Sequence, residues 1–93
     1  MALLVDANDD GMDLVNPKNE KFTLDEYYET LNCKEIEKFK QGTKCFVWDA
    51  NAINKELPEN EVATAMFYAE CDGFPKIQVL RGNVLVCEFK EVN

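Results

Sequence analysis

The chain has 93 residues, 46% of them hydrophobic and 30% charged, and its formal net charge is −8, from 18 acidic and 10 basic residues. This length fits one domain, residues 1–93, with a modest core, and the negative charge argues against direct nucleic-acid binding, because phosphate contacts need a basic surface. The chain contains no histidine and no serine, which excludes serine triads and Cys–His dyads.

The cysteines favour a reduced, cytoplasmic protein. Cys33, Cys45, Cys71 and Cys87 are scattered, form no CxxC pair and have no histidine to complete a mixed zinc site. No signal peptide is recognised, and no segment approaches the roughly 18 apolar residues of a membrane span. We therefore expect reduced thiols, with Cys45 and Cys87 in the core, no cofactor and no membrane contact.

The first residues predict a short strand, a polar turn and a second strand. Leu3–Val5 is apolar and Met12–Val15 is apolar except for Asp13, and an Asp- and Asn-rich stretch ending at Gly11 separates them. Half of a calcium-loop pattern occurs there, but Pro17 stands where the bidentate glutamate belongs. A turn accounts for the pattern, and a metal-dependent carboxylate enzyme remains an alternative, using Asp6, Asp9, Asp10 and Asp13.

A helix is predicted from Leu24 to Leu31. Thr23 and Glu26 match a capping box, and Phe22 and Tyr27 occupy the positions of a hydrophobic staple. Apolar residues recur at helical spacing from Leu24 onward, and Asn32 is a suitable stop.

Residues 33–40 and 44–49 predict a hairpin, because they flank Gln41-Gly42-Thr43. Lysines gather here within an acidic chain, and two explanations stay open for them. They either protect a sheet edge or form a local anion site, using Lys34, Lys38, Lys40 and Lys44.

A second helix is predicted over residues 61–70, with Asn60 as its N-cap and an inward side formed by Val62, Ala65, Met66 and Ala69. Residues 76–90 then predict a C-terminal hairpin that turns at Gly82-Asn83. The order of elements indicates an α+β fold, with two helices packed on a largely antiparallel sheet of hairpins.

One ligand site is predicted around Arg81, the only arginine. Its planar donors suit a phosphate or a carboxylate, and the alternative is a solvated turn residue. If the neighbouring elements converge, further polar contacts come from Asn83, Asn60, Thr64 and Lys44.

Three short segments in order carry a family resemblance: Phe22–Glu26, Leu57–Thr64 and Gly82–Cys87. With these, the chain resembles a small domain of unknown function that is encoded by phages, prophages and conjugative elements of gut and related bacteria. The similarity spans about Ala2 to Phe89, and Asn32-Cys33-Lys34 departs from it where relatives often have a glycine pair.

The resemblance implies a non-enzymatic accessory protein that binds a host factor, with no active site to transfer. By analogy with small phage proteins, it suggests an anti-defence protein that binds a host protein or sequesters a nucleotide signal. An alternative is an acidic interaction module that imitates nucleic acid. Homo-oligomerisation is also expected, because the chain holds more large aromatics than two helices easily hide: Trp48, Phe67, Tyr68 and Phe74.

Overall fold

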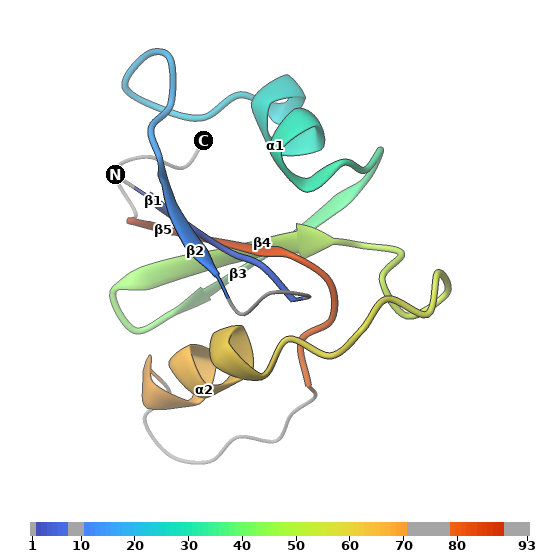
Figure 1. Cartoon of the computed structure of the whole chain (residues 1–93). Helices are drawn as coiled ribbons and strands as arrows, with labels where there is room; N and C mark the ends of the chain where they lie inside the picture. Colours follow the sequence, from blue (N-terminus) through green and yellow to red (C-terminus); the bar gives the residue numbers. More distant parts are fainter. Residues whose placement is uncertain (1, 8–10, 71–78, 89–93) are drawn as a thin grey trace.

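The computed structural model describes residues 2–7, 11–70 and 79–88 (Figure 1). Within them lie two helices and one antiparallel sheet with the strand order β2-β1-β5-β4-β3, which confirms the predicted α+β class. The elements are β1 Ala2–Val5, β2 Met12–Val15, α1 Leu24–Leu31, β3 Ile36–Gln41, β4 Lys44–Asp49, α2 Glu61–Glu70 and β5 Val84–Glu88.

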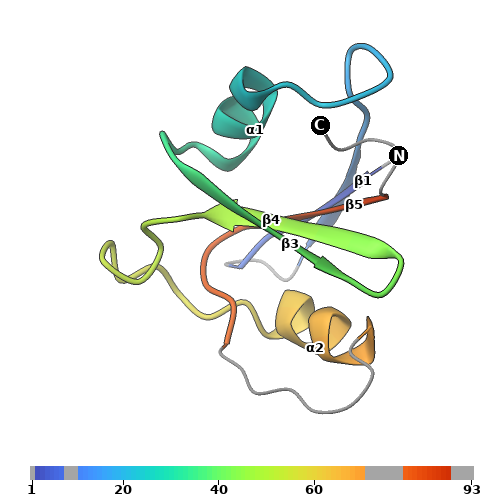
Figure 2. The ribbon, with the colours of Figure 1, turned by 180° about the vertical axis from the view of Figure 1, so that it is seen from behind.

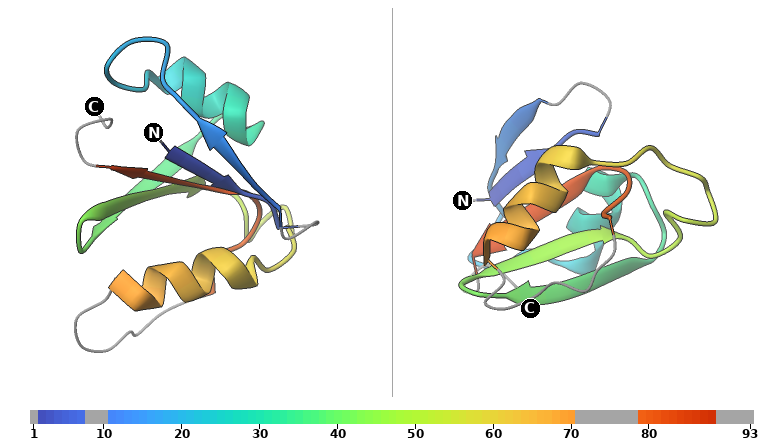
Figure 3. Two further views of the ribbon diagram at one scale, coloured as in Figure 1. Left: turned by 60° about the vertical axis from the view of Figure 1, so that its left-hand side comes forward. Right: turned by 90° about the horizontal axis from the view of Figure 1, so that it is seen from below.

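The two helices lie on opposite sides of the sheet, as the view from behind and the side view show (Figures 2 and 3). Consecutive residues of β4 and of β5 are buried. Because successive side chains of a strand point to opposite faces, both faces of these two strands are covered. One buried cluster joins Tyr27 and Leu31 of α1 to strand residues, among them Cys45, Val47, Leu85 and Cys87. The other joins Ala63 and Phe67 of α2 to Val5, Phe46, Val84 and Val86. The continuous apolar runs of β4 and β5 therefore supply two cores.

Helix α1 follows its sequence prediction from the first residue to the last. The Thr23 hydroxyl accepts from the Glu26 N–H (3.2 Å) and the Glu26 carboxylate accepts from the Thr23 N–H (3.0 Å). The rings of Phe22 and Tyr27 stack with centroids 5.5 Å apart, and Asn32 ends the helix in the left-handed conformation. Leu24, expected on the inward face, is exposed.

Helix α2 has the predicted bounds, but its buried face is only partly the predicted one, since Val62 and Met66 are partly buried against the cluster. Ala63, Thr64 and Phe67 are buried, whereas Ala65 and Ala69 are exposed. The rings of Phe39 and Phe46 contact that of Phe67, with centroid distances of 5.3 and 5.1 Å. The packing of Phe67 against these two rings therefore sets the orientation of the helix.

The first two hairpins are present, β1 with β2 and β3 with β4. Asp6 donates its N–H to the Gly11 carbonyl (2.8 Å) below the first turn, and Gly42 takes a positive φ of 63° in the second.

The predicted C-terminal hairpin is wrong for the residues that the structure describes. Strand β5 pairs with β1 on one side and β4 on the other, so neither edge is left for the residues before Gly82. Those residues run instead beside the segment that leads into α2: Asn60 N–H donates to Leu80 O and Gly82 N–H to Pro58 O, both 2.8 Å, and Glu59 bridges Arg81. The first part of the expected arm, residues 76–78, lies outside the described residues.

Candidate functional site

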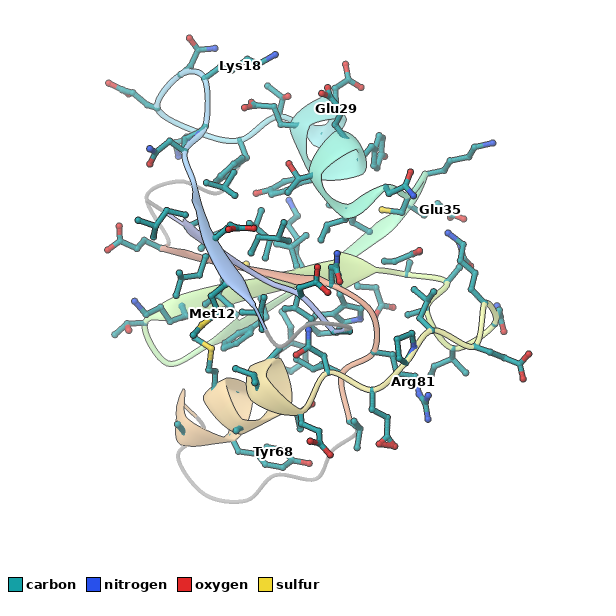
Figure 4. All side chains as sticks on the ribbon, in the orientation of Figure 1. Met12, Lys18, Glu29, Glu35, Tyr68 and Arg81 are labelled. Carbon is teal, nitrogen blue, oxygen red and sulfur yellow. The ribbon has the colours of Figure 1, made fainter. Side chains whose placement is uncertain are left out.

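Arg81 lies beside the chain that leads into α2 (Figure 4). Its guanidinium donates from Nη1 to the Leu57 carbonyl at 3.1 Å, and Nη2 lies 3.9 Å from a Glu59 carboxylate oxygen. The side chain is 37% exposed. A pair of this length and exposure is weak, so the guanidinium keeps an accessible face, but a neighbouring carboxylate competes with an incoming anion.

Asn60 and Thr64 come close to this segment, but their polar atoms hold the fold together. The Asn60 amide nitrogen donates to the carbonyls of Val5 (3.0 Å) and Gly82 (2.9 Å), and its oxygen accepts from the Ala63 N–H (3.0 Å). Thr64 Oγ1 donates to the Asn60 carbonyl (2.7 Å) and accepts from the Leu80 N–H (3.0 Å). Both residues are buried and turned inward.

The remaining two predicted residues do not converge on Arg81. Asn83 accepts the Ala7 N–H through Oδ1 at 3.1 Å and so ties the end of β1 to the start of β5. Lys44 pairs with Glu88 at one end of the β4–β5 ladder, whereas Trp48 pairs with Val84 at the other. Four residue steps of a strand are about 13 Å at ~3.3 Å per residue, which separates Lys44 from the other four.

The acidic turn lies partly outside the described residues, since residues 8–10 belong to it. In the part of the chain that is described, no group of three or more His, Cys, Asp or Glu residues is placed to hold a metal ion. Both carboxylate hypotheses, the calcium loop and the metal-dependent enzyme, need Asp10 and so stay predictions.

A buried carboxylate that the sequence did not suggest closes the turn after β4. Asp49 is buried; it accepts the Asn51 N–H at 2.8 Å and forms an ion pair with Lys55 at 2.7 Å. The hydrogen bond to Asp49 raises the pKa of the Lys55 amine. Burial, and secondarily the Asp49 charge, raise the pKa of the Cys33 thiol, so this thiol stays protonated at neutral pH.

The two edges of the sheet differ in how they are protected. Edge strand β3 carries Glu37, Lys38 and Lys40, and charges on an edge discourage pairing with another chain. The Lys38 amine lies 5.9 Å from the centre of the Tyr27 ring. These lysines therefore fit the edge-protection explanation.

Edge strand β2 has no such lysines and presents apolar side chains to solvent. Met12 and Leu14 are 54% and 65% exposed; both belong to the sheet face on the α2 side, because they pair with Val5 and Leu3 of β1. Figure 4 shows Met12 reaching toward α2. In the described part of the chain β2 pairs with β1 alone. We call Met12–Val15 the β2 edge; its sequence signal was the alternation Met-Asp-Leu-Val without a lysine.

Only some of the aromatic residues that suggested homo-oligomerisation are exposed for contact with a second copy. Phe67 is buried and Trp48 half-buried, whereas Tyr68 is exposed. Phe74 lies outside the described residues.

Comparison of the chain with protein-family models, with curated proteins and with solved structures found no match. The resemblance to a mobile-element domain therefore stays a prediction. Neither described helix has the length and apolarity to cross a membrane.

Proposed function

We propose that this chain is a non-enzymatic binding protein that takes up an extended segment of a protein partner along the β2 edge. The observation that carries the proposal is the exposure of Met12 and Leu14 on a strand that pairs on one side only in the described structure. An unpaired strand offers a row of backbone donors and acceptors to an incoming strand. Among the described residues this edge stays accessible, while charged residues protect β3.

The β2 edge also specifies the chemistry of its partner. Residues directly opposite each other in an added antiparallel strand share a sheet face. A partner strand therefore places apolar side chains against Met12 and Leu14, and a basic side chain against Asp13 on the other face. The net charge of −8 favours approach of a basic segment.

We place this activity in an accessory protein of a phage or another mobile element, acting on a host protein in the bacterial cytoplasm. The family resemblance supports this origin; it lies in Phe22–Glu26, Leu57–Thr64 and Gly82–Cys87. An anti-defence role follows from the same analogy. The geometry gives little support to the hypothesis that the protein sequesters a nucleotide, because Asn60 and Thr64 are buried and Lys44 lies at the other end of β4.

A second candidate function, imitation of nucleic acid, rests on the charge alone. Eighteen acidic residues against ten basic ones suit a basic DNA-binding partner. This candidate predicts binding that weakens steeply with salt, whereas strand addition keeps its apolar contacts as salt rises.

The test is a pull-down from a bacterial host lysate with the tagged wild type, with Leu14→Lys and with Met12→Lys. A new lysine on the β2 edge disfavours an incoming strand, so we expect the true partner to be lost in both variants. Ile53→Lys is the matched control, since Ile53 is an exposed apolar residue of the turn after β4. It should retain the partner.

Three outcomes contradict strand addition: a partner captured equally by all variants, a partner lost only at high salt, or no partner across several hosts. Light scattering on the purified wild type tests whether a second copy of the chain binds to the same edge. A dimer that Leu14→Lys converts to a monomer assigns the edge to self-association instead.

A further inference from the structure

Two buried cysteines face each other across the middle of the sheet. Cys45 of β4 and Cys87 of β5 are directly opposite in the antiparallel register. Neither forms a disulfide, and neither is accessible to solvent. Both belong to the buried cluster on the α1 side, so their side chains leave the sheet on the same face. They lie 42 positions apart in the sequence.

The register alone brings the pair within reach of a disulfide. Directly opposite residues of an antiparallel pair have Cα atoms about 4.5 or 5.5 Å apart, depending on whether the pair is hydrogen-bonded. Disulfides span Cα separations of roughly 4.4–6.8 Å, so either case fits. A slip of one residue would turn the side chains of β5 to the wrong face. Because both faces of β4 and β5 are packed, this register is fixed.

The third described thiol is placed away from this pair. Cys33 precedes β3, whose first residue, Ile36, pairs with Asp49. Cys45 lies four strand residues from Asp49, about 13 Å at ~3.3 Å per residue. Cys33 therefore does not compete for Cys45 in the folded protein.

The surroundings of Cys45 explain why its thiol reacts slowly with an oxidant as long as the chain is folded. Burial raises the pKa of the Cys45 thiol, and the charges of Lys38 and Lys40 act in the opposite direction. Lys40 is the β3 residue that pairs with Cys45, so the two side chains leave the sheet on the same face. Burial is the larger effect, which keeps the folded thiol protonated and slow to react.

We propose that Cys45 and Cys87 are a cross-strand redox pair, and that this protein acquires a disulfide between its two central strands when it folds in the presence of a small-molecule disulfide. One cysteine thiolate attacks the small disulfide and releases one thiol; the other cysteine thiolate then displaces the second. The two cysteines lose two protons and two electrons in total, and one molecule of the oxidant becomes two thiols.

The experiment uses the variant Cys33→Ser/Cys71→Ser, in which Cys45 and Cys87 are the only cysteines. It is unfolded in denaturant and refolded in a buffer of glutathione disulfide and glutathione, so that burial does not limit access to the thiols. We expect the intact chain to lose the mass of two hydrogen atoms, and proteolysis without reduction to release one peptide linking the two residues. The melting temperature should rise by at least about 5 °C, because the bond restrains the unfolded chain, and a reductant should reverse the rise.

Wild-type protein refolded in the same way should give the same linked peptide, which removes any dependence on the folding of the variant. The variant with Cys45→Ala added is the control and should gain neither the mass change nor the rise in melting temperature. Two alkylatable thiols in the refolded product, a stable adduct of glutathione, or a disulfide between chains would each overturn the proposal.

Discussion

Asn60 shows how one polar side chain can organise three parts of the chain. Its amide is hydrogen-bonded to the end of β1, to Gly82 before β5 and to the first turn of α2. The residue was predicted as a helix cap, and the cap is present. Its burial could not be predicted, since it depends on carbonyls of Val5 and Gly82 that are distant in sequence.

Replacing Asn60 with alanine should therefore cost more than the loss of an ordinary cap. A lost cap is worth roughly 0.5–2 kcal/mol, and buried carbonyls left without a donor add about 1–3 kcal/mol. We expect Asn60→Ala to lower the free energy of unfolding by about 2–4 kcal/mol, measured by urea denaturation. Thr23→Ala, at the exposed cap of α1, is the matched control and should cost about 1 kcal/mol. Equal losses would contradict the bridging role of Asn60.

At the scale of elements, local patterns predicted the bounds of both helices and the positions of the first two hairpins, although β3 begins at Ile36 and not at Cys33. The capping box of α1 and the cap of α2 are local signals, and they are sufficient to predict where each helix begins. The C-terminal hairpin failed because Gly82-Asn83 looks like a hairpin turn, although strand partners are chosen across the whole chain. The inward face of α2 was only partly predicted: Val62 and Met66 pack inward, but Thr64 is polar yet buried against the Leu80 N–H. The absent hairpin and the buried polar face of α2 also explain why Asn60, Thr64 and Asn83 do not form a site with Arg81. Lys44 is a separate case, because it lies at the other end of β4.

Helix α1 should show a measurable acid dependence through Glu26. Hydrogen bonds from the backbone of Lys18, at 2.9 Å, and of Thr23 hold the pKa of the Glu26 carboxyl below its ordinary value of 4.5. A carboxyl whose folded-state pKa is lowered adds stability above its unfolded pKa, and this stability is lost as pH falls through the folded-state pKa. Wild type should therefore lose more stability on acidification from neutral pH than Glu26→Gln, whose side chain does not titrate.

Urea midpoints measured at neutral pH and at a pH well below 4.5 test this difference. The two proteins should converge as the pH falls. Parallel curves would show that the Glu26 carboxylate contributes nothing to folding.

For the whole molecule, charge is the property that acts on every element at once. A net charge of −8 on 93 residues produces repulsion within the compact state, which salt screens. We expect the melting temperature to rise as sodium chloride is increased from low to physiological ionic strength. A fall would show that local attractions such as Lys55 with Asp49 outweigh the overall repulsion.

The strand order has a consequence for how this protein is made. The central strand, β5, is the last strand among the described residues, and its pairing with β1 joins residues 79 to 83 positions apart. On the ribosome, β1–β2 and β3–β4 emerge first as separate hairpins, each with its future inner edge exposed. The sheet closes only when Val84–Glu88 arrives between them. A fold with such distant contacts is expected to form slowly, in milliseconds to seconds, and its nascent hairpins are exposed to aggregation until β5 has been synthesised.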